Sequence, residues 1–235
     1  MSATQDGVVF LFDCDNTLLD NDRIHDDLDA HLRELLGAGT AAQYWRVYEE
    51  LRAALGYADY LGAVQRLRLE LPADPRVLQL SGFMLDYPFA DRLYPGALDA
   101  VKHCRRWGLT AILSDGDAVF QPLKLERSGI RAAVEGCVLI FVHKERELEE
   151  MMRIYPARRY VMVDDKLRLL AAMKSTLGER LFTVFPRQGH YARDTAGNVA
   201  LPAADLSIEH IGELSSFDFG SVAWDRSYSN GGAKA

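Results

Sequence analysis

Short, continuous apolar runs recur along this chain and are bounded by polar or turn-forming residues. Such runs are typical of strands buried on both faces of a parallel sheet. They span residues 8–12, 109–113, 137–142, 160–163 and 181–185, with a short extended segment at 205–208. Helical patterns lie between or beside them at about 97–107, 118–128, 145–153 and 166–177. This alternation predicts an α/β core of three layers, in which a mostly parallel sheet lies between helices.

After the first run, helical periodicity replaces the strand pattern over residues 21–92. The first apolar stripe comprises Leu28, Leu32, Leu35 and Leu36, with Asp26 and Asp27 expected at its amino end and Gly37 at its stop. Thr40 is expected to cap a second helix that ends near Gly56, a third begins near Tyr60, and Asp74-Pro75 opens a fourth that ends before Pro88. The chain therefore divides into a core at 1–20 and 93–215, a helical insertion at 21–92, and a loosely ordered tail at 216–235.

The first four apolar runs each end in a different set of functional groups. These sets are Asp13 and Asp15; Ser114, Asp115 and Gly116; Lys144; and the pair Asp164 and Asp165. Because ligands bind at the carboxyl edge of an open α/β sheet, we expect these groups to meet in one site. Two acids at one strand end can supply a metal ligand, a nucleophile and a general acid–base. Clustered acids repel one another unless a cation is present, so the pattern itself indicates a metal ion.

These four motifs, in this order, resemble those of the haloacid dehalogenase (HAD) superfamily, specifically its Mg²⁺-dependent phosphatase branch. The resemblance covers about residues 7–20 and 93–215, and the segment Leu93-Tyr94-Pro95-Gly96 is similar to the family's return from its cap domain into the core. The resemblance implies a Rossmann-like core. It also identifies the helical insertion as a C1-type helical cap that closes over the site and excludes water.

The same resemblance implies a role for each of the residues at the strand ends. Asp13 is then the nucleophile and Asp15 the general acid–base. Lys144 is a catalytic residue that, with Ser114, holds the phosphoryl oxygens, and Asp115 and Gly116 belong to the same phosphate-binding set. Asp165, with Asp164 beside it, completes a Mg²⁺ site to which Asp13 and Asp15 also contribute. Mg²⁺ prefers oxygen ligands of this kind, together with substrate phosphate and water.

The chain departs from the family's usual motifs at a few positions. Asp115 stands where Asn is more common, Glu145 follows Lys144 where Pro is usual, and Leu169 stands where a further Asp is frequent. Lys124 is the rival candidate for the third-motif lysine. It lies in the predicted helix 118–128, away from a strand end, and is expected to matter little. His190, on a loop after the fifth run, is more often structural than catalytic.

The function that these residues indicate is a Mg²⁺-dependent phosphatase that hydrolyses a small phosphorylated metabolite through an aspartyl-phosphate intermediate. A phosphomutase of the same family would share every catalytic residue. Metal-free haloacid dehalogenation shares the fold and the Asp nucleophile, but that branch lacks an acid at the position of Asp15. A non-catalytic binding member is the fourth alternative, although binding alone would not need both Asp13 and Asp15.

The composition limits the classes of binding partner and the cellular compartment that we expect for this protein. The net charge of −7 and the absence of a basic cluster argue against nucleic acid or an anionic membrane as partner. No amino-terminal segment resembles a signal peptide, no apolar run is long enough for a spanning helix, and three widely spaced cysteines fit reduced thiols. We therefore expect a cytoplasmic protein, either a monomer or a homodimer, in which Cys14 is a small buried residue rather than a redox switch.

Overall fold

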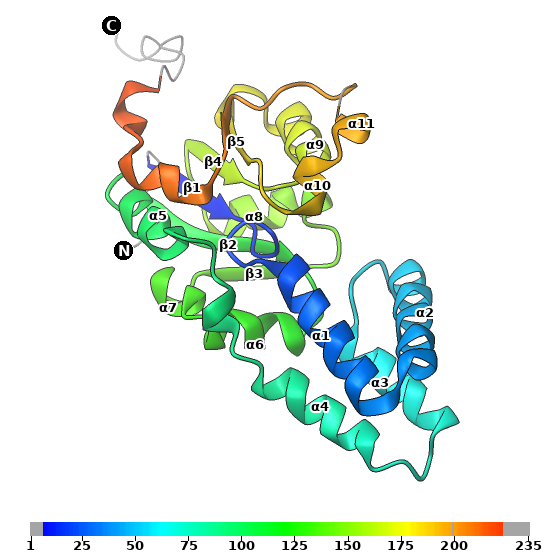
Figure 1. Ribbon diagram of the computed structural model, residues 1–235. Helices are drawn as coiled ribbons and strands as arrows, with labels where there is room; N and C mark the ends of the chain where they lie inside the picture. Colours follow the sequence, from blue (N-terminus) through cyan, green and yellow to red (C-terminus); the bar gives the residue numbers. More distant parts are fainter. Residues whose placement is uncertain (1–6, 199, 223–235) are drawn as a thin grey trace, which may run out of the picture.

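Within the described residues, six parallel strands form a single sheet at the centre of the core, and the helices α1–α4 lie to one side of it (Figure 1). The computed structural model describes residues 7–198 and 200–222. The strands are β1 (Val8–Phe12), β2 (Leu109–Asp115), β3 (Val138–Phe141), β4 (Arg159–Val163), β5 (Leu181–Pro186) and β6 (Leu206–Ile208). Their order across the sheet is β3-β2-β1-β4-β5-β6, and every paired neighbour runs parallel. The predicted strands, and the parallel α/β core that they imply, are confirmed.

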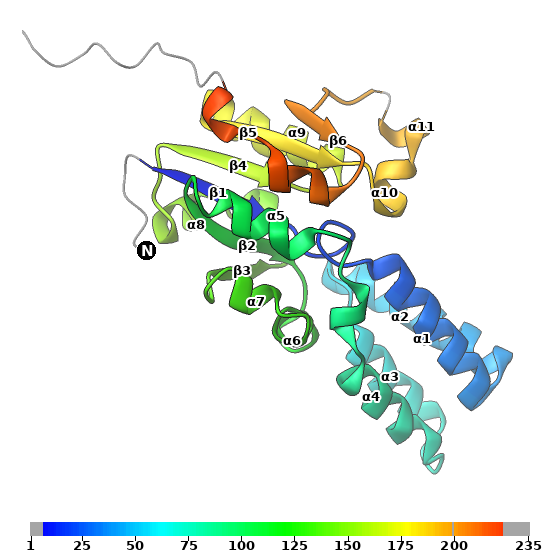
Figure 2. The same ribbon diagram turned by 60° about the vertical axis from the view of Figure 1, so that its left-hand side comes forward.

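Helices cover both faces of this sheet, which explains why its strands are apolar throughout. In β1, Phe10 and Phe12 pack into the hydrophobic cluster on one face, whereas Val9 and Leu11 pack into the cluster on the other. The first face carries α5 (Ala97–Cys104), α6 (Phe120–Arg127), α7 (Ile130–Ala133) and the 3₁₀ helix η4 (Ile211–Ser216). The second carries α8 (Leu148–Ile154) and α9 (Leu167–Leu177) (Figure 2). The strand order is that of Rossmann-like folds.

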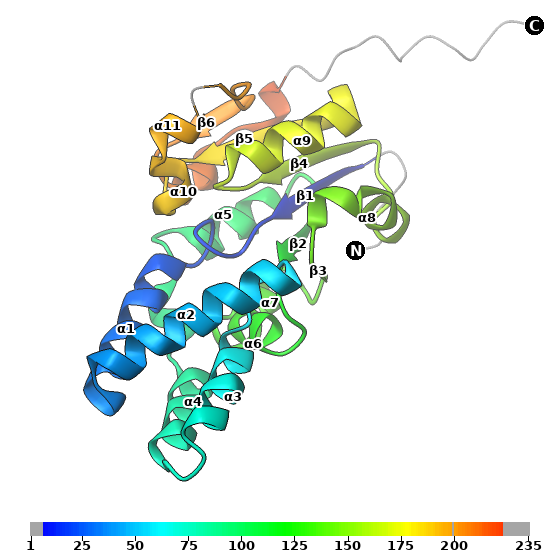
Figure 3. The same ribbon diagram turned by 90° about the vertical axis from the view of Figure 1, so that its right-hand side faces the viewer.

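The helical insertion stands beyond the carboxyl ends of the strands (Figures 2 and 3). It comprises α1 (Asn21–Leu36), α2 (Ala38–Leu55), α3 (Tyr60–Glu70), α4 (Arg76–Asp86) and the 3₁₀ helix η1 (Phe89–Arg92). These helices share a hydrophobic cluster of their own, in which Leu32, Tyr44 and Leu67 are fully buried. The chain leaves and re-enters the core side by side, because Asp20 N–H donates to Arg92 O at 2.8 Å and Tyr94 N–H donates to Leu18 O at 2.9 Å.

Several predicted helix limits were wrong, each for a local reason. The side chain of Asp20 caps α1, so Asp26 and Asp27 lie inside that helix rather than at its start. Gly37, with a φ of +86°, both ends α1 and precedes α2, so Thr40 lies within α2 and caps nothing. The helix predicted at 145–153 is divided into the 3₁₀ helix η2 (Lys144–Arg146) and α8.

The predicted tail also does not begin at residue 216. Phe219, in the 3₁₀ helix η5 (Phe219–Ser221), is buried against the sheet, and its ring centroid lies 4.8 Å from that of Phe10. Residues 217–222 therefore belong to the core, and the remainder of the predicted tail, 223–235, lies outside the described residues. Three further short helices are η3 (Gly178–Arg180), α10 (Gly189–Arg193) and α11 (Thr195–Asn198). None of the helices in the described ranges combines the length and apolar character that a bilayer crossing requires.

Candidate active site

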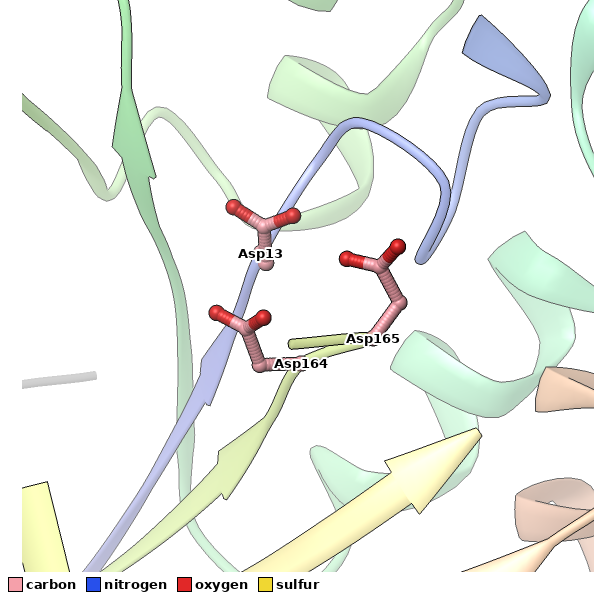
Figure 4. A group of neighbouring side chains, drawn as sticks. All are labelled: Asp13, Asp164 and Asp165. Carbon is pink, nitrogen blue, oxygen red and sulfur yellow. The ribbon is translucent and has the colours of Figure 1, made fainter. Parts of the chain in front are cut away.

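Three buried carboxylates meet at the carboxyl edge of the two central strands (Figure 4). Asp13 follows β1, and Asp164 and Asp165 follow β4, which is paired with β1. The strand order reverses between these two strands, and crevices at such a point are where α/β sheets bind ligands. One oxygen from each carboxylate lies within 4.8 Å of the others. The structure thus brings together three of the four acids predicted for the metal site.

Lys144 lies in the same group and is fully buried. Its Nζ is 2.5 Å from Asp13 Oδ1 and 2.6 Å from Asp164 Oδ2. Burial disfavours the ammonium, but the carboxylates of Asp13 and Asp164 outweigh it and raise the pKa of Lys144. Lys144 therefore stays charged at neutral pH, at the place predicted for the third-motif lysine.

Asp165 is the member of the group without a partner. Both of its carboxylate oxygens are buried, and neither accepts a hydrogen bond from any residue that the structure describes. Asp164 Oδ2 also lacks a well-aligned hydrogen bond, but its ion pair with Lys144 leaves it partnered. Burial, followed by repulsion from Asp164 and Asp13, raises the pKa of Asp165 well above its ordinary value. An unpartnered buried carboxylate is costly, and a bound cation would remove that cost.

The chemistry of this donor set fits a hard divalent cation. All the converging atoms are carboxylate oxygens, which Mg²⁺ prefers, and the three acids exceed the single positive charge that Lys144 places among them. Asp13, Asp164 and Asp165 are the residues that would hold the ion. Asp15, the fourth predicted ligand, does not place its carboxylate in this group.

Two hydroxyl groups flank the Asp13 carboxylate. Ser114 Oγ lies 3.4 Å from Asp13 Oδ1 and accepts a hydrogen bond from Gln121 Nε2 at 3.1 Å. Thr17 Oγ1 lies 3.5 Å from Asp13 Oδ2 and accepts from the backbone N–H of Asp165 at 3.1 Å. The second motif therefore reaches the Asp13 carboxylate as predicted, and Thr17 links the first motif to the fourth.

Asp115 and Gly116, at the end of β2, form hydrogen bonds with the end of β3 and the segment that follows it. The Asp115 carboxylate accepts a hydrogen bond from the backbone N–H of Lys144 at 2.7 Å. That bond joins the end of β2 to the start of η2. Burial raises the pKa of Asp115. The N–H of Gly116 donates to Phe141 O at 3.0 Å, so it is already used in joining β2 to β3.

Lys124, which was expected to lie away from the strand ends, contacts Asp15. Lys124 is only 1% exposed, and its Nζ donates to both carboxylate oxygens of Asp15, at 2.6 and 2.7 Å. Burial disfavours its charge, but Asp15 outweighs that effect and raises the pKa of Lys124. Lys124 is one of the buried residues of α6, with Phe120 and Gln121, and from there it reaches Asp15 although it does not follow a strand.

Sequence reasoning also missed Lys166, the residue after the acid pair. It is partly buried, and the carboxylates of Asp13 and Asp164 raise its pKa against the opposing effect of burial. Its Nζ lies 5.0 Å from the centre of the Tyr191 ring. The signal that was available is its position: a residue directly after two strand-end acids lies at the same edge as they do.

A cavity of about 830 Å³ opens between this site and the helical insertion. Asp15, Asp115 and Lys166 line it from the core. Arg52 and Tyr60 line it from the helical insertion. Cavities of this size are typical of small-molecule sites.

Helix α10 joins the two sides of this cavity. His190 Nδ1 lies 2.5 Å from Asp22 Oδ1 at the start of α1, and Arg52 Nη2 donates to the hydroxyl of Tyr191 at 2.6 Å. His190 is thus placed at the cavity wall and contacts the helical insertion rather than the carboxylate group. Cys14 lies in the core cluster, where burial raises the pKa of its thiol, as expected of a small buried residue.

The comparisons with known proteins agree with this geometry. A family model described as haloacid dehalogenase-like hydrolase matches residues 8–175. A crystal structure from Burkholderia xenovorans LB400, described as that of a haloacid dehalogenase-like hydrolase, is 59% identical in sequence, with a TM-score of 0.85; the match covers 91% of this chain and 99% of that one. The chain belongs to the haloacid dehalogenase-like hydrolases, as the motifs had predicted. No curated protein matches it.

More distant structures share the fold alone. L-2-haloacid dehalogenase from Xanthobacter autotrophicus is 15% identical, with a TM-score of 0.58 over 92% of this chain and 97% of that one. A HAD-hydrolase from Bacillus subtilis, solved with magnesium bound, is 18% identical, with a TM-score of 0.55 over 89% of this chain and 97% of that one. The fold is therefore shared by a dehalogenase and by a magnesium-bound hydrolase, and the choice between their chemistries depends on the side chains of this chain.

Proposed function

We propose that this hydrolase is a Mg²⁺-dependent phosphatase that acts on a small phosphorylated metabolite. The observation that carries the proposal is the buried group of Asp13, Asp164 and Asp165, in which the two oxygens of Asp165 have no partner among the described residues. A divalent cation would satisfy both oxygens of that acid, whereas a metal-free site would leave them without a partner among the described residues. Asp15, which dehalogenases lack at this position, supports the same choice.

In this proposal Asp13 attacks the phosphorus atom of the ester, and the Asp13–phosphorus bond forms as the bond to the leaving oxygen breaks. Ser114 and Lys144 lie beside the Asp13 carboxylate, where they would hold the transferred group by a hydrogen bond and a charge. Bound Mg²⁺ would supply further charge neutralisation. The charge of Lys144 would stay in place because its pKa is raised.

Asp15 is the proposed acid and base. It would give a proton to the leaving oxygen and would then take one from the water that hydrolyses the aspartyl phosphate. Its side chain is 27% exposed and lines the cavity, so it can face substrate and water. This assignment separates the two first-motif acids into a nucleophile within the carboxylate group and an acid–base at the cavity wall.

The proposed substrate is small because of the volume of the cavity between the core and the helical insertion. A volume of about 830 Å³ is in the range of sites for small molecules. In our proposal the phosphoryl group lies on the sheet edge and the leaving group faces the insertion, which acts as a C1-type cap. Side chains such as Arg52 and Tyr60 would then select the leaving group.

A two-part screen tests this function. The purified protein is incubated with a panel of phosphate monoesters and with a set of 2-haloacids, in Mg²⁺, and the release of inorganic phosphate and of halide is measured. We expect phosphate release from some esters and no halide release. Halide release without phosphate release would assign the protein to the dehalogenases instead. Transfer of phosphate within a sugar phosphate, without its release, would indicate a mutase.

A further inference from the structure

Lys124 is a buried cation that the proposed reaction does not use. It is 1% exposed and absent from the cavity wall, so it cannot touch a substrate there. Its Nζ donates three hydrogen bonds within the described residues, to the two oxygens of Asp15 at 2.6 and 2.7 Å and to Asn21 Oδ1 at 3.2 Å. The three N–H donors of the ammonium are therefore matched by three oxygen acceptors.

Stability alone does not explain this arrangement. A buried ion pair is often no more stable than apolar residues of similar volume, and the rest of the buried side of α6 is formed by Phe120, Gln121 and Leu125. The pair is also one-sided, because Lys124 is sealed from solvent while the Asp15 side chain is 27% exposed and lines the cavity. Whatever Lys124 contributes to the reaction, it contributes through Asp15.

The hydrogen bonds of Lys124 join three parts of the molecule at the edge of the cavity. Asp15 belongs to the loop after β1, Lys124 to core helix α6, and Asn21 is the first residue of the helical insertion. Helix α6 is itself anchored to the insertion, because the Phe120 ring lies 5.2 Å from that of Tyr60 and 5.6 Å from that of Phe89, centre to centre. Lys124 thus holds Asp15 at the junction of core and insertion.

We propose that Lys124 is a positioning residue for Asp15, which fixes the orientation of that carboxylate so that it can pass a proton to and from the cavity. This inference rests on the proposed function, since it takes Asp15 as the acid–base. Each carboxylate oxygen has two acceptor positions, so an oxygen held by Lys124 on one side remains free to carry a proton on the other. The ion pair would limit rotation of the carboxyl group, and positioned proton transfer depends on such alignment.

The leaving group provides a readout that a purely structural role would not move. An alkyl phosphate needs its leaving oxygen protonated, whereas 2,4-dinitrophenyl phosphate expels an anion that is stable without a proton. Lys124→Met should therefore lower kcat/KM for an accepted alkyl phosphate by about 10-fold or more, as expected when a general acid is misaligned. It should change kcat/KM for 2,4-dinitrophenyl phosphate by less than about threefold, because that ratio reports formation of the aspartyl phosphate and not its hydrolysis.

Three further variants complete the design. Lys124→Arg keeps the charge and should restore part of the loss on the alkyl ester. Lys102→Met removes an exposed lysine from α5 and should change neither substrate. In an Asp15→Asn background, adding Lys124→Met should cost nothing further, because two residues that act as a unit are not additive.

The outcomes separate this inference from the proposed function. Equal losses on both esters, or an additional loss in the Asp15→Asn background, would show a structural role and overturn the inference alone. An unchanged kcat/KM of Lys124→Met on the alkyl ester would also overturn the inference and leave the proposed function intact. If the wild-type protein releases no phosphate from any ester in Mg²⁺, the proposed function fails and the inference fails with it.

Discussion

The Asp13 carboxylate contacts three polar side chains and also lies beside the carboxylates of Asp164 and Asp165. Lys144 and Ser114 contact one oxygen and Thr17 the other. An amide of the same shape would keep these neighbours but cannot form an acyl phosphate. We therefore expect Asp13→Asn to lower kcat by ~10⁴-fold or more, the scale on which loss of a nucleophile is felt. Circular dichroism should be unchanged.

The matched control for this variant is Asp99→Asn, which changes an exposed Asp on core helix α5. It should keep the wild-type rate. If Asp13→Asn retained more than about a tenth of the activity while folded, Asp13 would not be the nucleophile.

Asp164 and Asp165 are adjacent but differ in what holds them. Asp164 forms an ion pair with Lys144 through Oδ2, and its Oδ1 accepts a hydrogen bond from the backbone N–H of Lys166 at 2.8 Å. Both oxygens of Asp165, in contrast, have no partner among the described residues. Asp165 therefore has the more available carboxylate. Asp165→Ala should weaken Mg²⁺ binding by about tenfold or more, or ~1.4 kcal/mol, and by more than Asp164→Ala does. Calorimetric titration of both variants with Mg²⁺ measures this, and an equal or reversed order would contradict it.

Lys144 and Lys124 show which side-chain positions could be predicted from the sequence and which could not. Lys144 was placed correctly because it lies in the short segment after β3, and strand ends converge wherever a parallel sheet forms. The position of Lys124 was misjudged because its contact with Asp15 depends on how α6 packs in the folded molecule, which no local pattern encodes. A Lys on the apolar side of a predicted helix was nevertheless a usable signal, since a buried ammonium requires a partner.

Elements with an unambiguous hydrophobic pattern were predicted well. The strands buried on both faces and the amphipathic helices of the insertion lie within a few residues of their expected positions. Boundaries failed where a single side chain or glycine decides them, as at Asp20 and Gly37. The predicted start of the tail was wrong because the burial of Phe219 against Phe10 depends on the completed sheet, which the composition of residues 216–235 does not reveal.

The helical insertion and the core should have separable effects on catalysis. Arg52, on α2, lines the cavity and donates to the Tyr191 hydroxyl across it. In our proposal it faces the leaving group, so Arg52→Met should change kcat/KM by different factors for different esters. Lys144→Ala, beside the phosphoryl position, should lower kcat/KM for all esters by a similar factor.

Comparison of the two variants on at least two chemically different phosphate esters measures this difference. Arg66→Met changes an exposed arginine on α3 of the insertion and is the control, expected to be without effect. A uniform loss in Arg52→Met, or an ester-dependent loss in Lys144→Ala, would mean that the division between the two parts is wrong.

At the scale of the whole molecule, a cation bound only to the folded state should stabilise it by mass action. At a Mg²⁺ concentration 100 times its dissociation constant the gain is about 2.7 kcal/mol. For a chain of this length each kcal/mol raises Tm by roughly 2–4 °C. We expect Mg²⁺ to raise the Tm of the wild-type protein and to have a much smaller effect on Asp165→Ala. The same rise in both would place the ion elsewhere.

The central claim is that the three buried carboxylates form a Mg²⁺ site on which phosphoryl transfer depends. The most direct measurement is the initial rate of phosphate release from an accepted ester, from excess EDTA up to saturating free Mg²⁺. The account predicts no rate above background in EDTA and a saturable rise as Mg²⁺ is restored. A full rate in excess EDTA would contradict it.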